Sequence, residues 1–223
     1  MFAKYATTLP KPPASRNYSK IGEPWGMLGN DTICDCVYAG MGHADMLWSF
    51  WGQRLNLPVV TADVLQAYSA VTGYNPSDPN SDQGGSLLDA LKWWRKVGIR
   101  GQKIDSFMEI TPADTTSMKL AIDLFGCAYV GVNLPDNVLP GHTVPTWTKT
   151  SLPPNPNNGH CVIVVRYTSA SVYVVTWGQL LRASWPFMKK YCDEAYAALA
   201  PAWCPYKPSG FDYATLQADL AVL

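Results

Sequence analysis

The sequence has no excess of charge of either sign and little charge altogether. Its 223 residues include 17 Lys or Arg and 17 Asp or Glu, so the formal net charge is zero. Proteins that bind nucleic acid through its phosphates carry a basic excess, so we expect no nucleic acid partner. Charged residues make up 15% of the chain, against about 25% in an average soluble domain. The 48% of hydrophobic residues is enough for a sizeable core and argues against a disordered chain.

Long apolar runs and a recognisable secretory leader are also missing. Apolar runs such as residues 161–165 are far shorter than the roughly 18 residues that cross a bilayer. The first ten residues lack the basic end and apolar stretch of a signal peptide. We therefore expect no membrane partner, and a location that is cytoplasmic or else not determined by the sequence.

Six cysteines are present, but they do not indicate a disulfide framework, because a chain of this length and apolar content can build its own core. We expect mostly free thiols, with a Cys192–Cys204 bridge left open for an oxidising setting. Cys34 and Cys36 look like half of a metal site, yet no second close Cys or His pair follows. The expectation is therefore no metal and no cofactor.

Helical patterns come first along the chain and strand patterns later. Residues 1–29, rich in Pro and Gly, predict an extended lead-in, and residues 30–223 predict one domain. Apolar residues at three- and four-residue steps predict helices, and β-branched runs predict a hairpin. This order is typical of an α+β fold, with a helical half at about 30–110 and a β-rich half at about 111–223. The predicted helices are 37–51, 61–72, 87–97, 112–125 and 185–199, and the predicted hairpin strands are 161–167 and 172–177.

Cys36 is the candidate nucleophile, because it follows a polar loop at the start of the first helix. The partial positive charge and free N–H groups of a helix N-terminus favour a thiolate there. The alternative is an inert buried cysteine, since free cysteines commonly pack as small hydrophobes. Asp35, just before it, is expected to cap the helix and to oppose ionisation of the thiol.

A thiol nucleophile needs a base, and the chain contains three histidines. His43 lies about 10 Å from Cys36 along the same helix, at 1.5 Å per residue, which is too far for a hydrogen bond. His142 lies in a Pro-Gly-His-Thr turn with no polar residue converging on it in sequence. His160 opens an apolar strand, where a rigid element can present an imidazole at the rim of a cleft. His160 is therefore the predicted base.

Several separate segments, over about residues 15–185, resemble the papain-like cysteine proteases. Cys36 begins the helix of the nucleophile, and Gly84-Gly85 leads into a later helix. His160 begins a strand, and Trp177-Gly178 ends another. The order is that of the mature catalytic domain without its pro-segment. The resemblance implies a helical lobe and an antiparallel β lobe, with the active cleft between them.

The resemblance also implies roles for residues around Cys36 and His160. Asn30, six residues before Cys36, takes the position of the amide that stabilises the oxyanion, where the family has Gln. Trp177 would shield the imidazole from solvent, and Gly159 would contact the substrate. The expected reaction is thiol-dependent hydrolysis of a peptide or related amide bond.

On the helical side, the resemblance implies that Gly84 and Gly85 bind the backbone of an extended substrate and that Leu87 lines an apolar pocket beside them. The family links the nucleophile loop to this region by a disulfide. Here the nearest cysteine on one side is Cys34, and Asp82 or Gln83 stands on the other side, so no equivalent bridge is expected.

The third catalytic residue departs from the family. Aligned on the Trp-Gly pair, the family's Asn falls on Val175, which cannot orient the histidine. A shift of one residue would bring Thr176 to that place, and Gln179 is a more distant candidate. A Cys-His dyad is also workable. Two other functions therefore stay open: a cell-wall amidase or transferase with the same chemistry, and a non-catalytic structural or virion component of papain fold, whose assembly partner is unknown.

Overall fold

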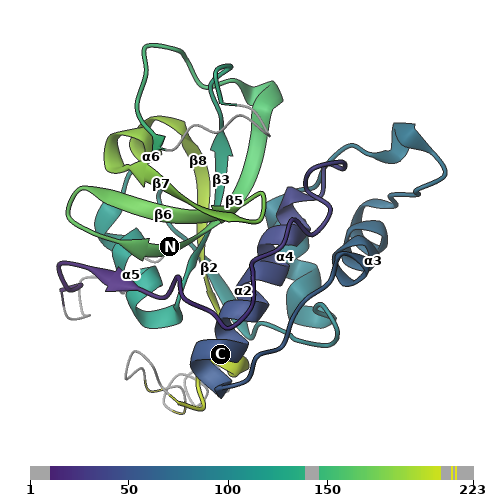
Figure 1. The fold of residues 1–223 in the computed structure, drawn as a ribbon, viewed down its shortest axis with the longest axis horizontal. Helices are drawn as coiled ribbons and strands as arrows, with labels where there is room; N and C mark the ends of the chain where they lie inside the picture. Colours follow the sequence, from purple (N-terminus) through teal and green to yellow (C-terminus); the bar gives the residue numbers. More distant parts are fainter. Residues whose placement is uncertain (1–10, 139–145, 207–211, 213, 215–223) are drawn as a thin grey trace.

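The helical lobe is built around one buried helix, α2 (Cys36–Gln53), with α3 (Thr61–Thr72) and α4 (Leu87–Lys96) beside it (Figure 1). The computed structural model describes residues 11–138, 146–206, 212 and 214. Most side chains of α2 are buried, as its apolar residues on both faces predict. No helix within these residues is both long and apolar enough to cross a membrane.

The ends of the helices follow local sequence signals. α3 ends at Gly73, whose φ of 79° is the left-handed conformation that glycine adopts freely. α4 begins at the predicted residue 87, and the hydroxyl of Ser86 caps it by accepting a hydrogen bond from the Asp89 amide at 3.3 Å. α3 has the predicted bounds 61–72, and Val60 holds the cap position before it.

The β lobe is one sheet with the order β2-β8-β3-β5-β6-β7-β4, and β1 pairs with β5. All the described pairs are antiparallel except β4 with β7. The predicted hairpin is confirmed as β5 and β6. α5 (Thr115–Phe125) packs against β8, and α6 (Trp185–Tyr191) follows β7. The strands are β1 (Arg16–Asn17), β2 (Ser106–Glu109), β3 (Ala128–Asn133), β4 (Thr146–Trp147), β5 (Gly159–Tyr167), β6 (Ser171–Thr176), β7 (Gln179–Ser184) and β8 (Cys192–Leu199).

The predicted helix over 185–199 is wrong in its second half. The helix α6 ends at Tyr191, and β8 begins at Cys192 and lies between β2 and β3. The alanines and leucine of β8 favour a helix locally, but hydrogen bonds to strands on both sides decide the outcome. Six of its eight residues are buried, so no alternation of polar and apolar residues marks it as a strand.

The N-terminal segment crosses the β lobe before it reaches the helices (Figure 1). Arg16 and Asn17 form β1 on the edge of β5, and the side chains of Tyr18 and Trp25 are buried. Arg16 forms an ion pair with Asp123 of α5. The part of the lead-in that precedes residue 11 lies outside the described residues.

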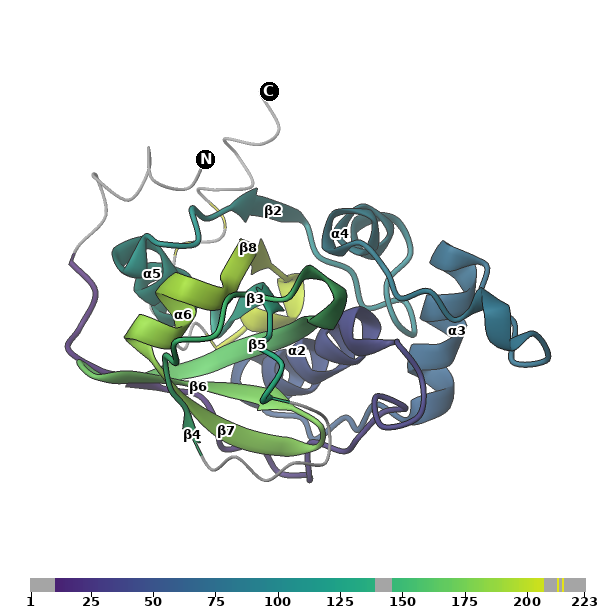
Figure 2. The same cartoon turned by 90° about the horizontal axis from the view of Figure 1, so that it is seen from above.

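The two lobes meet where α2 packs against β5 and β6, with α4 and α3 farther from the sheet (Figure 2). The Tyr129 hydroxyl of β3 donates a 2.6 Å hydrogen bond to the carbonyl of Val37, in the first turn of α2. A Cβ at Gly40 would lie 3.0 Å from the Tyr129 ring and 3.3 Å from the Cys161 sulfur. Glycine therefore lets the start of α2 lie close to β3 and β5.

Candidate active site

Cys36 is the first residue of α2, at the end of a polar loop. Its side chain is half-buried, and its sulfur lies near the backbone N–H groups of Cys161 and Val37, which favour a negative charge on it. Burial acts in the opposite direction and raises the pKa of the Cys36 thiol to about 11. At neutral pH the resting group is therefore a thiol, held next to the residue that follows His160.

His160 is the second residue of β5, and its orientation is fixed by two neighbours. Its Nε2 atom lies 2.5 Å from the hydroxyl oxygen of Thr176. The Trp177 ring stacks on the imidazole, with 4.6 Å between ring centroids and 23° between planes. Burial lowers the pKa of His160 to about 3, so the resting imidazole is neutral.

The contact with Thr176 bears on which nitrogen of His160 can take a proton. A neutral imidazole carries one N–H and one free lone pair. With Nε2–H donating to the threonine hydroxyl, the lone pair is on Nδ1. Nδ1 is then the nitrogen available to a thiol on the other side of the cleft.

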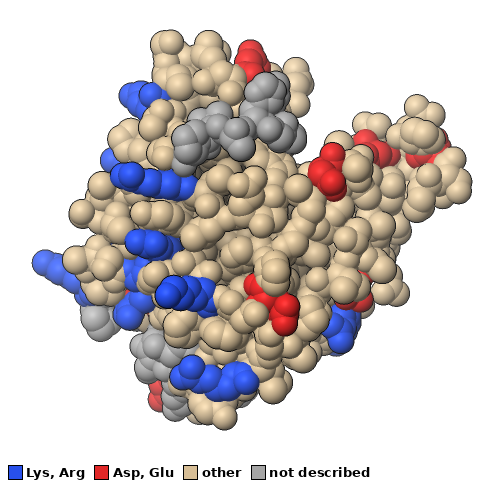
Figure 3. Space-filling model, in the orientation of Figure 1, with Lys and Arg blue, Asp and Glu red and all other residues tan. Residues whose placement is uncertain are grey.

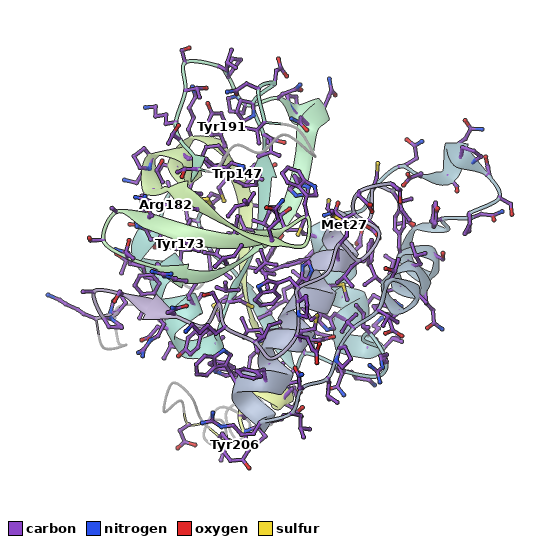
Figure 4. The ribbon with its side chains drawn as sticks, viewed as in Figure 1. Met27, Trp147, Tyr173, Arg182, Tyr191 and Tyr206 are labelled. Carbon is purple, nitrogen blue, oxygen red and sulfur yellow. The ribbon has the colours of Figure 1, made fainter. Side chains whose placement is uncertain are left out.

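The hairpin turn between β6 and β7 places Trp177. Thr176 pairs with Gln179, so Trp177 and Gly178 form a two-residue turn, with φ of 47° and 69°. Trp147, labelled in Figure 4, packs edge-on against Trp177 with 5.9 Å between centroids. Trp147 in turn lies 5.3 Å from the ring of Phe187. The rings of Phe187, Trp147 and Trp177 therefore pack one against the next and hold the imidazole from the side of the β lobe.

The helical wall of the cleft is held by a hydrogen-bonded network instead of a disulfide. The Asp82 carboxylate accepts a 3.0 Å hydrogen bond from the Cys34 amide and a 2.8 Å bond from the Tyr68 hydroxyl. The Tyr68 oxygen accepts a 2.9 Å hydrogen bond from the Gly84 amide. A Cβ at Gly85 would lie 2.8 Å from the Tyr38 ring. The network connects the nucleophile loop to the two glycines.

These elements enclose one cleft of about 650 Å³, and Figure 3 shows a notch in the outline of the molecule between the two lobes. The structure brings together all nine predicted site residues, because Thr176 is buried behind His160 and the other eight line the cleft. These eight are Asn30, Cys36, Gly84, Gly85, Leu87, Gly159, His160 and Trp177.

The other candidate groups lie elsewhere or are not described. His43 is buried, and its Nε2 lies 3.0 Å from the carbonyl oxygen of Gly26, as expected for a packed histidine. His142 lies outside the described residues. The thiols of Cys34, Cys36, Cys127, Cys161 and Cys192 are free, so Cys192 forms no bridge with Cys204. In the described ranges, no three His, Cys, Asp or Glu side chains are grouped so that they could hold a metal ion.

Sequence reasoning missed Trp147, Asp193 and Glu194, and it gave Asp35 the wrong role. Asp35 holds the cap position of α2, but its side chain makes no capping hydrogen bond, which corrects the expected role. No sequence pattern pointed to Trp147, because a lone tryptophan among Thr and Pro residues belongs to no helix or strand periodicity. Asp193 and Glu194 line the cleft, yet they lie in the segment predicted as a helix. Their place depends on strand pairing, which local sequence does not specify.

Comparisons with known proteins find similarity in structure only. No family model and no curated protein sequence matches the chain. Xylellain, a cysteine protease from Xylella fastidiosa, is 11% identical with a TM-score of 0.51, over 88% of each chain. The bromelain protease from Ananas comosus is 12% identical with a TM-score of 0.60, over 84% of this chain and 99% of that one.

A third structure, the digestive procathepsin L 3 of Tenebrio molitor, is 12% identical with a TM-score of 0.57, over 87% of this chain and 72% of that one. At such identities the likeness concerns the fold. The chain has the α+β fold of the papain-like cysteine proteases.

Proposed function

We propose that this protein is a thiol-dependent hydrolase that cleaves peptide or related amide bonds. Cys36 is the nucleophile, His160 the base and acid, and Thr176 the residue that positions the imidazole. One observation carries the proposal: Cys36 and His160, 124 positions apart in sequence (160 minus 36), line the same cleft. The fold of cysteine proteases supports it, since that fold places a cysteine and a histidine on opposite lobes.

In the proposed mechanism, Nδ1 of His160 takes the thiol proton as the Cys36 sulfur attacks the substrate carbonyl. The backbone N–H of Cys36 and the side-chain amide of Asn30 stabilise the oxyanion. The imidazolium then gives its proton to the leaving amine, and a thioester to Cys36 remains. Water attacks the thioester as His160 takes its proton, which releases the acid and restores the thiol. Gly84 and Gly85 would bind the substrate backbone.

The test is covalent labelling with a peptide vinyl sulfone, followed by mass-spectrometric mapping. We expect one modification per chain, on Cys36, at neutral pH. Cys34 is the matched control, because it lies two residues away and is exposed. The variant Cys34→Ser keeps the labelling and Cys36→Ser loses it. Labelling of Cys34 at the same rate as Cys36, or of neither, contradicts the proposal.

A non-catalytic component of the same fold is the second candidate, and one observation favours it. Burial raises the pKa of Cys36 and lowers the pKa of His160, so neither group is ionised at rest. In that case Cys36 reacts with iodoacetamide no faster than an ordinary free thiol. An enzyme instead shows faster alkylation of Cys36 that is lost in His160→Ala.

We expect Thr176→Val to lower kcat by about tenfold with little change in KM. Valine keeps the shape of the side chain but loses the hydroxyl that holds Nε2 of His160, and a hydrogen bond to a charged group is worth about 1.5–3 kcal/mol. Thr176→Ser keeps a hydroxyl and stays near the wild-type rate. Steady-state kinetics on a fluorogenic peptide measure both. A wild-type rate in Thr176→Val together with a loss in Thr176→Ser would show that the methyl group, rather than the hydroxyl, matters.

A further inference from the structure

Two consecutive carboxylates, Asp193 and Glu194, lie in the β-lobe wall of the active cleft. They line the same cavity as Cys36 and His160. No Lys or Arg is among the described residues that line it, and within that part of the chain neither carboxylate belongs to an ion pair. In Figure 3 most basic side chains on the visible face lie over the β lobe, on the side away from the notch between the lobes. The cleft therefore has negative charge without a counter-charge of its own.

A β-bulge turns both side chains toward the cleft. Between β3 and β8 the register passes from Gly131 opposite Glu194 to Val132 opposite Cys192, so Asp193 is an extra residue. In a regular strand, consecutive side chains point to opposite faces. A bulge interrupts this alternation and redirects a side chain, often next to active sites. Here it allows Asp193 and Glu194 to line the same cavity.

Gly131 makes room for the two carboxylates. A Cβ at this position would lie 2.9 Å from Cγ of Glu194 and 3.0 Å from Oδ1 of Asp193. Any other residue would push these side chains away from the wall. The side of the cavity at Gly131 is therefore shaped by the two carboxylates.

Polar neighbours orient the carboxylates but leave them unneutralised. Glu194 Oε2 accepts a 2.9 Å hydrogen bond from the Tyr196 hydroxyl, and Asp193 Oδ2 accepts one of 2.9 Å from Asn133. Partial burial raises the pKa of Glu194, and the charges of Asp193 and Glu109 add to this effect. A cation in the cavity would relieve both the burial cost and the repulsion.

The carboxylates lie within reach of a substrate bound at Cys36. Cys161, Gly131 and Glu194 form one row across β5, β3 and β8. At about 4.8 Å between strands, the backbone of Glu194 is about 10 Å from that of Cys161. The Cys36 sulfur lies near the Cys161 amide. A long side chain within two residues of the scissile bond can therefore span this distance.

We propose that this cavity receives a lysine or arginine side chain of the substrate, whose cationic end lies at Asp193 and Glu194. The two unneutralised carboxylates favour a cationic group, and their distance from Cys161 requires a long side chain. The inference rests on the proposed hydrolase function, because the peptide must be held at Cys36. It specifies the substrate class as peptides with a basic residue next to the cleaved bond.

The test compares two peptide vinyl sulfones that differ in one residue, arginine or its neutral isostere citrulline, at the second position before the reactive group. We expect the arginine probe to label Cys36 at least tenfold faster. In Glu194→Gln and in Asp193→Asn the ratio of the arginine rate to the citrulline rate falls, and in the double variant it approaches one. High salt also reduces the preference, since exposed charges are screened.

The matched control is Asp31→Asn, which removes one negative charge from the helical side of the same cleft. The Asp31→Asn variant keeps the preference for the arginine probe if the charges of Asp193 and Glu194 recognise the cation. Equal labelling of the wild type by the two probes, or the same loss of preference in Asp31→Asn as in Glu194→Gln, overturns this inference and leaves the hydrolase proposal standing. No labelling by either probe overturns the hydrolase proposal and this inference with it.

Discussion

Replacing His160 with alanine is expected to lower kcat/KM for a peptide substrate by about 10²- to 10⁴-fold, the range for a lost general base. The physical reason is that burial keeps the Cys36 thiol protonated, so the attack depends on a base that takes the proton during the reaction. Cys36→Ser removes the sulfur and is expected to lose at least as much. Initial rates on a fluorogenic peptide measure both effects.

The His160 variant also separates catalysis from folding. His160 pairs with Val132 in the sheet through its backbone, which alanine preserves. We expect the thermal unfolding midpoint to change by only a few degrees, so a loss of rate with a retained transition reports chemistry. Activity within threefold of the wild type in either His160→Ala or Cys36→Ser would contradict the proposed mechanism.

The two residues of the proposed reaction could be predicted because their local contexts are distinctive. Cys36 follows a polar loop and begins a helix that is apolar on both faces. His160 follows Gly159 and opens a run of β-branched residues, which predicts a strand. Ser86 after two glycines marks the start of a helix. Each of these signals is short-range, and each element begins within two residues of its predicted start.

The residue that orients His160 could be narrowed to a few candidates from the sequence, but it could not be identified. Val175 and Thr176 point to opposite faces of β6, so the choice depends on the length of the next turn. That turn has Trp177 at a φ of 47°, a conformation that bulky side chains seldom adopt. Stacking on His160 and the edge-on contact with Trp147 compensate for this cost in the folded protein. No local sequence pattern predicts such a turn.

The wall that carries Asp193 and Glu194 could not be predicted for a different reason. Residues 192–199 have the composition of a helix and become a strand through pairing with β2 and β3, whose residues lie more than 55 positions away. Even a correct strand prediction would place the two carboxylates on opposite faces of the sheet. The bulge at Gly131 arises from the register between strands, which the sequence of one strand does not contain.

Asp35 is a buried carboxyl next to the nucleophile, and it makes the stability of this protein depend on pH. Its side chain has no exposure, and neither carboxyl oxygen accepts a hydrogen bond from another residue. A Cβ at Gly29 would lie 2.5 Å from its Oδ2 atom, so the glycine permits the burial. Burial, with the nearby charges of Asp82 and Asp31, raises the pKa of Asp35 from 3.8 to about 8.

The direction of the pH effect follows from this raised pKa. Between about pH 4 and pH 8 the folded protein keeps the proton on Asp35 and the unfolded chain loses it. Because the folded state then binds more protons, the free energy of unfolding falls as the pH rises through this range. At about 1.4 kcal/mol per pH unit, the full loss is about 6 kcal/mol. Below about pH 4 both states are protonated and the effect is absent.

Asp35→Asn is therefore expected to stabilise the protein at pH 8, by several kcal/mol on this scale, and to change little at pH 4. The asparagine side chain is also buried without partners, but it carries no charge to lose. Urea unfolding at a series of pH values measures the difference, with the exposed Glu23→Gln as the control. In Asp35→Asn the thiol of Cys36 should also react faster with iodoacetamide at pH 8, because the neighbouring negative charge that raises its pKa is gone. A variant less stable than the wild type at pH 8, or a difference independent of pH, would show that Asp35 is not the group that titrates.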